Sequence, residues 1–151
     1  MCVMPDTDVL NLYLPPSDFA TRYAAEYLVP NLHLAKVVPF RKVASGTWVP
    51  KQYCCHDNVH RWTKLDQDAL QVLGWLVIDH RSTMGFVRFM MHSVAVSIAT
   101  DEHYDITPTD AEGKYPFLPG GLDGDRYFEF EKQLIDVYGV SRFDVLVRCG
   151  Q

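Results

Sequence analysis

The longest strand that the sequence predicts is FVRFMMHSVAVSIA, residues 86–99. Valine, isoleucine, phenylalanine and methionine dominate it, as is typical of buried strands. A turn, RSTMG, precedes it at 81–85, and a second turn follows near Asp101. Shorter strands are predicted beyond these turns, at 75–79 and 104–106. Because short connections join antiparallel neighbours, the three strands are expected to form a β-meander.

Helices are predicted on both sides of this meander in the sequence, at roughly 19–29, 55–64, 66–73 and 126–138. Ser17 or Asp18 can cap the first helix, and Pro30 ends it. Gly74 is expected to end the third helix. A last strand, at the edge of the sheet, is predicted at 143–147.

These elements predict a single α+β domain over residues 1–151, with helices packed on one antiparallel β-sheet. No internal repeat, low-complexity tract or linker divides the sequence. Two stretches, 31–50 and 108–124, are expected to be irregular because proline and glycine punctuate them.

Composition excludes several classes of protein. The 151 residues are 48% hydrophobic and 22% charged, which indicates a folded domain rather than a disordered chain. A net charge of −5 without a basic cluster argues against nucleic-acid binding. No apolar run is long enough to span a membrane, and residues 1–14 lack the basic start of a signal peptide. The sequence does not indicate an oligomeric state.

The four cysteines, at positions 2, 54, 55 and 149, bear on the cellular compartment. Adjacent Cys54 and Cys55 are a poor start for a disulfide framework, because neighbouring cysteines rarely reach disulfide geometry. We therefore expect a reducing, cytoplasmic environment. Export as an effector without a classical signal peptide stays open.

Cys55 is the residue whose setting points most directly to chemistry, because it stands where a predicted helix begins. Unpaired N–H groups and the positive end of the helix dipole stabilise a thiolate at such a position. The thiolate is the nucleophilic form of cysteine. The same N–H groups can bind the oxyanion that forms when a carbonyl carbon becomes tetrahedral.

A base and an orienting acid follow Cys55 in the sequence. His92 lies in the middle of the longest predicted strand, where an imidazole among apolar side chains needs a polar partner. Asp105 lies in the next strand, close enough through the intervening turn to be that partner. A carboxylate on one imidazole nitrogen fixes the tautomer and leaves the other nitrogen for the thiol.

The sequence around these residues resembles the papain-like cysteine hydrolases, in particular their transglutaminase-like and NlpC-like relatives. The resemblance is carried by Cys55 at a helix start, by HSV at 92–94 and by YDITP at 104–108. It covers residues 52–108 and implies that Cys55, His92 and Asp105 are nucleophile, base and acid. A papain-like fold, a thioester intermediate and no cofactor are implied with them. The expected substrate is a protein or peptide amide, and the expected enzyme a glutamine deamidase, amidase, protease or transferase.

The sequence departs from the family pattern close to the nucleophile. His56, rather than tryptophan, follows Cys55, and Gln52 precedes it more closely than the oxyanion glutamine of the family does. Gln52 and Asn58 are both candidate donors to an oxyanion. Trp75 is a candidate for the wall of the substrate cleft, or else a core residue.

Three alternatives stay open. Cys54 is a second candidate nucleophile, although Cys55 is preferred because the polar residues 56–58 follow it. Zinc could bind His56 and His60 together with Cys54 or Cys55, but the spacing matches no standard zinc motif and no metal is predicted. A binding module of the same fold, without catalysis, would keep Cys55 as an ordinary thiol.

Overall fold

The computed structural model describes residues 11–109 and 115–147. Its helices are α1 (Asp18–Tyr23), α2 (Cys55–Leu65), α3 (Arg81–Met84) and α4 (Gly124–Tyr138). A π-helical turn (Ala24–Leu28) and a 3-10 helix (Val29–Leu34) prolong α1. The strands are β1 (Ala69–His80), β2 (Phe86–Ser97), β3 (His103–Tyr104), β4 (Phe117–Pro119) and β5 (Arg142–Leu146).

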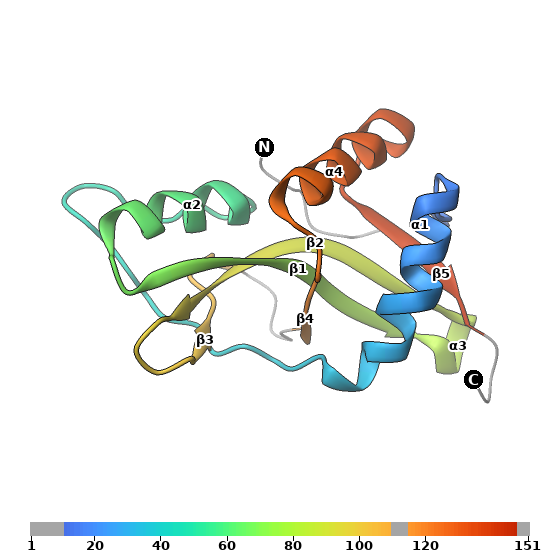
Figure 1. Cartoon of the computed structure of the whole chain (residues 1–151), viewed down its shortest axis with the longest axis horizontal. Coiled ribbons are helices and arrows are strands. Elements are labelled where there is room, and N and C mark those ends of the chain that lie inside the picture. The colour runs from blue at the N-terminus through green and yellow to red at the C-terminus, as the bar shows by residue number, and fades with distance from the viewer. Residues whose placement is uncertain (1–10, 110–114, 148–151) are drawn as a thin grey trace.

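The five described strands form one curled antiparallel sheet around β2 (Figure 1). Strand β1 pairs with β2 along its full length, from Ala69 opposite Ser97 to His80 opposite Phe86. The other edge of β2 is shared by β5, near Phe86, and by β3, near Ala95. Strand β4 pairs with the outer edge of β1. The predicted α+β class and the predicted antiparallel meander are both confirmed.

The helices cover the sheet in two groups, and each group has its own buried cluster. Helices α1 and α4 pack over the part of the sheet that carries Trp75, whose side chain is fully buried among aromatic rings. Helix α2 covers the other end, where Val59 packs with Ala95 and Ile106. Figure 1 shows α2 and α4 meeting above the middle of β1 and β2. The first turn of α2 therefore lies against the centre of the sheet.

The predicted third helix at 66–73 is wrong, because Ala69 to Leu73 belong to β1. Pairing with a twelve-residue apolar partner strand outweighs local helix propensity there. Gly74 does not end a helix but lies inside β1, where an added Cβ would stand 2.3 Å from the Leu118 carbonyl oxygen. Glycine at this position lets β4 approach β1 closely.

Other differences from the predicted elements are smaller. The predicted loop at 108–124 contains β4, and its residues 110–114 lie outside the described part of the chain. The predicted turn at 81–85 is one helical turn that ends at Gly85, whose φ of 75° favours glycine. The edge strand expected at 143–147 is confirmed as β5. Within the described ranges, no helix has the length and apolar character needed to cross a membrane.

Candidate active site

Cys55 is the first residue of α2, as predicted, and a tight turn delivers it there. Tyr53, two residues earlier, has a φ of 65°, which is uncommon for a side chain of its size and often occurs near functional sites. The Cys54 N–H closes the turn onto the Lys51 carbonyl oxygen at 3.3 Å, and the first helical bond runs from Asn58 N to Cys54 O at 2.8 Å. The Cys55 side chain thus lies at the N-terminus of α2, and only 4% of the residue is exposed.

His92 and Asp105 are paired as the sequence predicts. The Nε2 atom of His92 lies 2.7 Å from Oδ2 of Asp105. The other carboxylate oxygen of Asp105 accepts the Thr107 N–H at 3.0 Å, which fixes the plane of the carboxylate. Because Nε2 is used by Asp105, Nδ1 is the nitrogen of His92 left for the thiol, and Cys55 and His92 are close enough for their charges to interact.

A chain of hydrogen bonds returns from Asp105 to the helix that carries Cys55. Thr107 Oγ1 accepts from Nδ2 of Asn58 at 3.1 Å, and Asn58 lies one turn beyond Cys55 on α2. The same Nδ2 donates to the Lys51 carbonyl at 2.7 Å, and Oδ1 of Asn58 accepts the Lys51 N–H at 2.9 Å. The turn before the nucleophile and the loop after the acid are therefore fixed to one side chain.

The charges of the site favour a thiolate–imidazolium pair. Burial raises the pKa of the Cys55 thiol, but the positive charges of His92 and His56 and their hydrogen bonds outweigh it and lower the pKa to about 5. Burial lowers the pKa of His92, but the Cys55 thiolate and the Asp105 carboxylate outweigh it and raise the pKa to about 10. At neutral pH the sulfur is therefore negative and His92 is positive.

Tyr127 of α4 holds the backbone of His92. Gly74 and His92 face each other across β1 and β2. The hydroxyl of Tyr127 lies between them, accepting from the His92 N–H at 3.1 Å and donating to the Gly74 carbonyl at 2.6 Å. The ring is completely buried, and burial raises the pKa of the phenol well above its usual value. A neutral hydroxyl from α4 thus completes the β1–β2 pairing beside the imidazole.

The three other predicted site residues have different positions. Nε2 of Gln52 is buried and has no hydrogen-bond partner among the described residues, so this donor is available to a ligand. Both hydrogens of the Asn58 amide are used within the protein, so Asn58 positions the site rather than donating to an oxyanion. Trp75 is wrong as a cleft residue, because it lies in the core and donates to the Tyr23 hydroxyl at 2.9 Å.

The structure bears on two alternatives, Cys54 as the nucleophile and a zinc site that includes His60. Cys54 is disulfide-bonded, so of the two adjacent cysteines Cys55 is the free thiol. With Cys54 in a disulfide, the expected reducing, cytoplasmic environment loses the support it took from the cysteines. Cys2 and Cys149 lie outside the described residues. His60 is exposed on α2, and no three His, Cys, Asp or Glu side chains of the described ranges cluster in a way that suits a metal ion.

Sequence reasoning missed a second histidine–carboxylate pair beside the sulfur. His56 is buried directly after Cys55, and its Nε2 lies 3.3 Å from Oε2 of Glu131 on α4. Its Nδ1 forms a short hydrogen bond with the hydroxyl of Ser93 on β2. The one available signal was that a histidine follows the cysteine where the family has tryptophan. Nothing in the sequence pattern pairs His56 with the distant Glu131.

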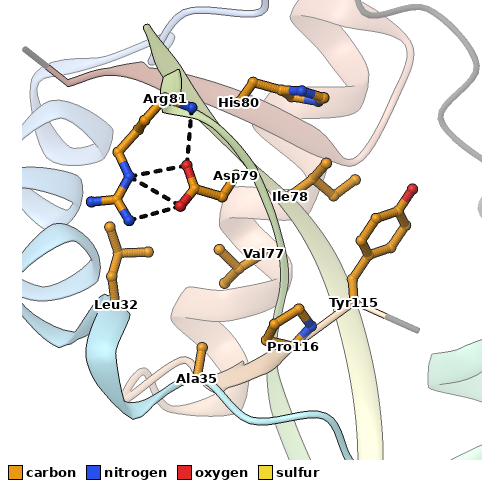
Figure 2. Close-up of a pocket in the computed structure, with 9 residues that line it drawn as sticks. All are labelled: Leu32, Ala35, Val77, Ile78, Asp79, His80, Arg81, Tyr115 and Pro116. Carbon is orange, nitrogen blue, oxygen red and sulfur yellow. Dashed lines mark hydrogen bonds and ion pairs between the residues drawn. The ribbon is translucent and has the colours of Figure 1, made fainter. Parts of the chain in front are cut away.

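A pocket at the far end of β1 is separate from these residues. It is lined by Val77 to Arg81 together with residues of the 3-10 helix and of the segment before β4 (Figure 2). The Asp79 carboxylate and the Arg81 guanidinium pair with each other at its rim, 2.7 Å apart. Since Gly74, not Val77 to Arg81, faces His92, this pocket is not where Cys55 would meet a substrate.

The sequence matches no protein-family model, and neither a curated protein nor a solved structure is significantly similar to the chain. The function is therefore inferred from the geometry of the site and from the family resemblance of its residues.

Proposed function

We propose that the protein is a cysteine-dependent hydrolase or acyl transferase that acts on an amide through a thioester. One observation carries the proposal: Cys55 begins α2 within electrostatic reach of His92, whose Nε2 is held by Asp105 at 2.7 Å. Nucleophile, base and orienting acid are thereby arranged as covalent catalysis requires. The nucleophile lies on a helix, the base on a strand, and the acid directly after the next strand. This order supports a papain-like arrangement within the α+β fold.

In the first step the Cys55 thiolate attacks the carbonyl carbon and the carbonyl oxygen becomes an oxyanion. The N–H groups at the start of α2 and the unpaired Nε2 donor of Gln52 are the proposed oxyanion donors. As the C–N bond breaks, His92 gives its Nδ1 proton to the leaving nitrogen, and a thioester forms on Cys55.

In the second step His92 takes a proton from water, or from an amine in a transfer reaction. The new nucleophile attacks the thioester, and the Cys55 thiolate leaves. A carboxylic acid or a new amide is released. The resemblance to transglutaminase-like enzymes favours a protein glutamine or a peptide bond as substrate, which makes a glutamine deamidase, amidase or protease the proposed activity. No cofactor takes part in these steps.

The test uses substrates that need no knowledge of the biological target. A nitrophenyl ester should release a burst of nitrophenol and leave an acyl group on the peptide that contains Cys55. Ammonia release from glutaminyl peptides should then distinguish deamidation from peptide cleavage.

Cys55→Ala, His92→Ala and Asp105→Asn should suppress the burst, whereas His103→Ala in β3 is the control and should not. Wild-type protein that forms no acyl-enzyme and alkylates at the rate of a free thiol would instead indicate a binding module without catalysis.

A further inference from the structure

His56 is buried where the start of α2 meets β2 and α4. Only 5% of the residue is exposed. The ring meets Tyr127 and Phe128 edge to face, with centroid distances of 5.6 and 5.5 Å. These ring contacts, together with the hydrogen bond to Ser93, hold the imidazole in place.

Both nitrogens of His56 face polar groups that can accept a hydrogen bond. Ser93 Oγ, which pairs with Nδ1, also accepts from Nε2 of Gln71 at 3.1 Å, and Gln71 further donates to the His56 carbonyl at 3.3 Å. Nε2 faces the Glu131 carboxylate. A neutral imidazole has one N–H donor, whereas the imidazolium has two, and because the Ser93 hydroxyl can accept, the imidazolium can present one N–H to Ser93 and the other to Glu131.

The pairing with Glu131 also favours the charged form of His56. The facing Nε2 and Oε2 atoms are 3.3 Å apart but are not aligned as a hydrogen bond, and both are buried without any other partner in the described part of the chain. A neutral pair would leave two buried polar atoms unsatisfied, whereas an ion pair compensates both.

We propose that His56, held by Glu131 and Ser93, is a second cationic partner of the Cys55 thiolate, which is thereby stabilised by two histidine–carboxylate pairs. The inference rests on the proposed role of Cys55 as the nucleophile. The groups that face His56 are the Cys55 sulfur beside it, Glu131 and the neutral phenol of Tyr127 on α4, and Ser93 on β2. Burial lowers the pKa of His56, but Cys55 and Glu131 outweigh it and raise the pKa to about 9.

The second partner has a specific use in the reaction. When His92 gives its proton to the leaving nitrogen, it supports no negative charge on sulfur until it takes a proton from the second nucleophile. His56 keeps its proton, so the sulfur remains a good leaving group when the thioester breaks. His56 is therefore a positioning residue that sets the charge of the nucleophile, while His92 moves the proton.

The inference is tested by the pH profile of Cys55 alkylation by iodoacetamide in the full-length protein. His56→Gln should move the midpoint upward by about one to three pH units, because one of two positive neighbours is removed. His60→Gln, an exposed position on the same helix, is the matched control and should leave the midpoint near that of the wild type. A midpoint that is the same in His56→Gln, His60→Gln and wild type overturns the inference.

A second comparison distinguishes the proposed role of His92 from that of His56. His92→Ala should abolish acyl transfer but still alkylate at neutral pH about tenfold faster than the His92→Ala/His56→Gln double variant. Equal rates in these two proteins contradict a thiolate role for His56. If His56→Gln does not fold, as judged by circular dichroism, Glu131→Gln is tested in its place, and Glu129→Gln, at an exposed position on the same helix, is its control. Glu131→Gln alone should raise the midpoint, and an unchanged midpoint overturns the inference.

The two proposals can fail separately. Wild-type protein that has a low, His56-dependent midpoint but transfers no acyl group contradicts the proposed function and supports the second partner. Acyl transfer with a midpoint independent of His56 supports the function and overturns the second partner.

Discussion

At the residue scale, the role of Asp105 follows from its two oxygens. One faces Nε2 of His92 and the other accepts the Thr107 N–H. Asp105→Asn keeps the size of the side chain but puts an amide where a carboxylate accepted from the imidazole. We expect kcat for ester hydrolysis to fall by about a hundredfold or more, because the tautomer and charge of His92 are no longer held.

The measurement is steady-state kinetics with the nitrophenyl ester, with thermal unfolding as the control for stability. A variant that keeps wild-type kcat would show that Asp105 is only a turn residue before Thr107 and Pro108.

The protonation states of Cys55 and His92 predict how kcat/KM depends on pH. The thiolate of Cys55 is lost as pH falls through about 5, and the proton of His92 is lost as pH rises through about 10. Acylation needs the thiolate and the protonated imidazole together, so kcat/KM should form a plateau between these values and fall on both sides. An acid limb near the pKa of a free thiol, about 8.5, would contradict the ion pair.

At the element scale, α2 links the nucleophile to the loop of the acid through Asn58. Asn58→Ala removes the bonds to Lys51 and Thr107 and leaves the part-buried Lys51 N–H without this acceptor. We expect a loss of about 1–3 kcal/mol in the free energy of unfolding. A lower alkylation rate of Cys55 should accompany it, because the turn and Asp105 lose their common anchor. Urea unfolding measures the first effect, and Asp57→Ala, exposed on the same turn, is the control.

The elements also show which features of the fold can be predicted from local sequence and which cannot. Strand β2 and the start of α2 were predictable because apolar composition and a turn before the helix are local signals. Strand β1 was misassigned at residues 69–73 because its identity comes from pairing with β2, and Gly74 is explained only by the approach of β4. The proposed triad is predicted from residue order and from the family resemblance, whereas the His56–Glu131 pair depends on how α4 lies beside the start of α2, which no local pattern records.

At the scale of the whole molecule, a buried ion pair joins β2 and β5 at a position away from Cys55. Arg88 on β2 and Asp144 on β5 are fully buried, 2.6 Å apart at the closest atoms. Asp144 also accepts the Tyr13 N–H at 2.9 Å, and Arg88 donates to the Asn11 carbonyl at 2.7 Å. The pair therefore joins the segment before α1 to β2 and β5.

Removing one partner of such a pair leaves an uncompensated buried charge. Asp144→Ala should lower the free energy of unfolding by about 3–5 kcal/mol. Asp79→Ala, which breaks the partly exposed pair with Arg81, should cost about 1 kcal/mol or less. Both variants should keep the wild-type pH profile of Cys55 alkylation at temperatures where they are folded, because neither residue pairs with Cys55, His92 or Asp105. Equal destabilisation by the two substitutions would show that the Arg88–Asp144 pair does not hold β5 and the N-terminal segment to the sheet.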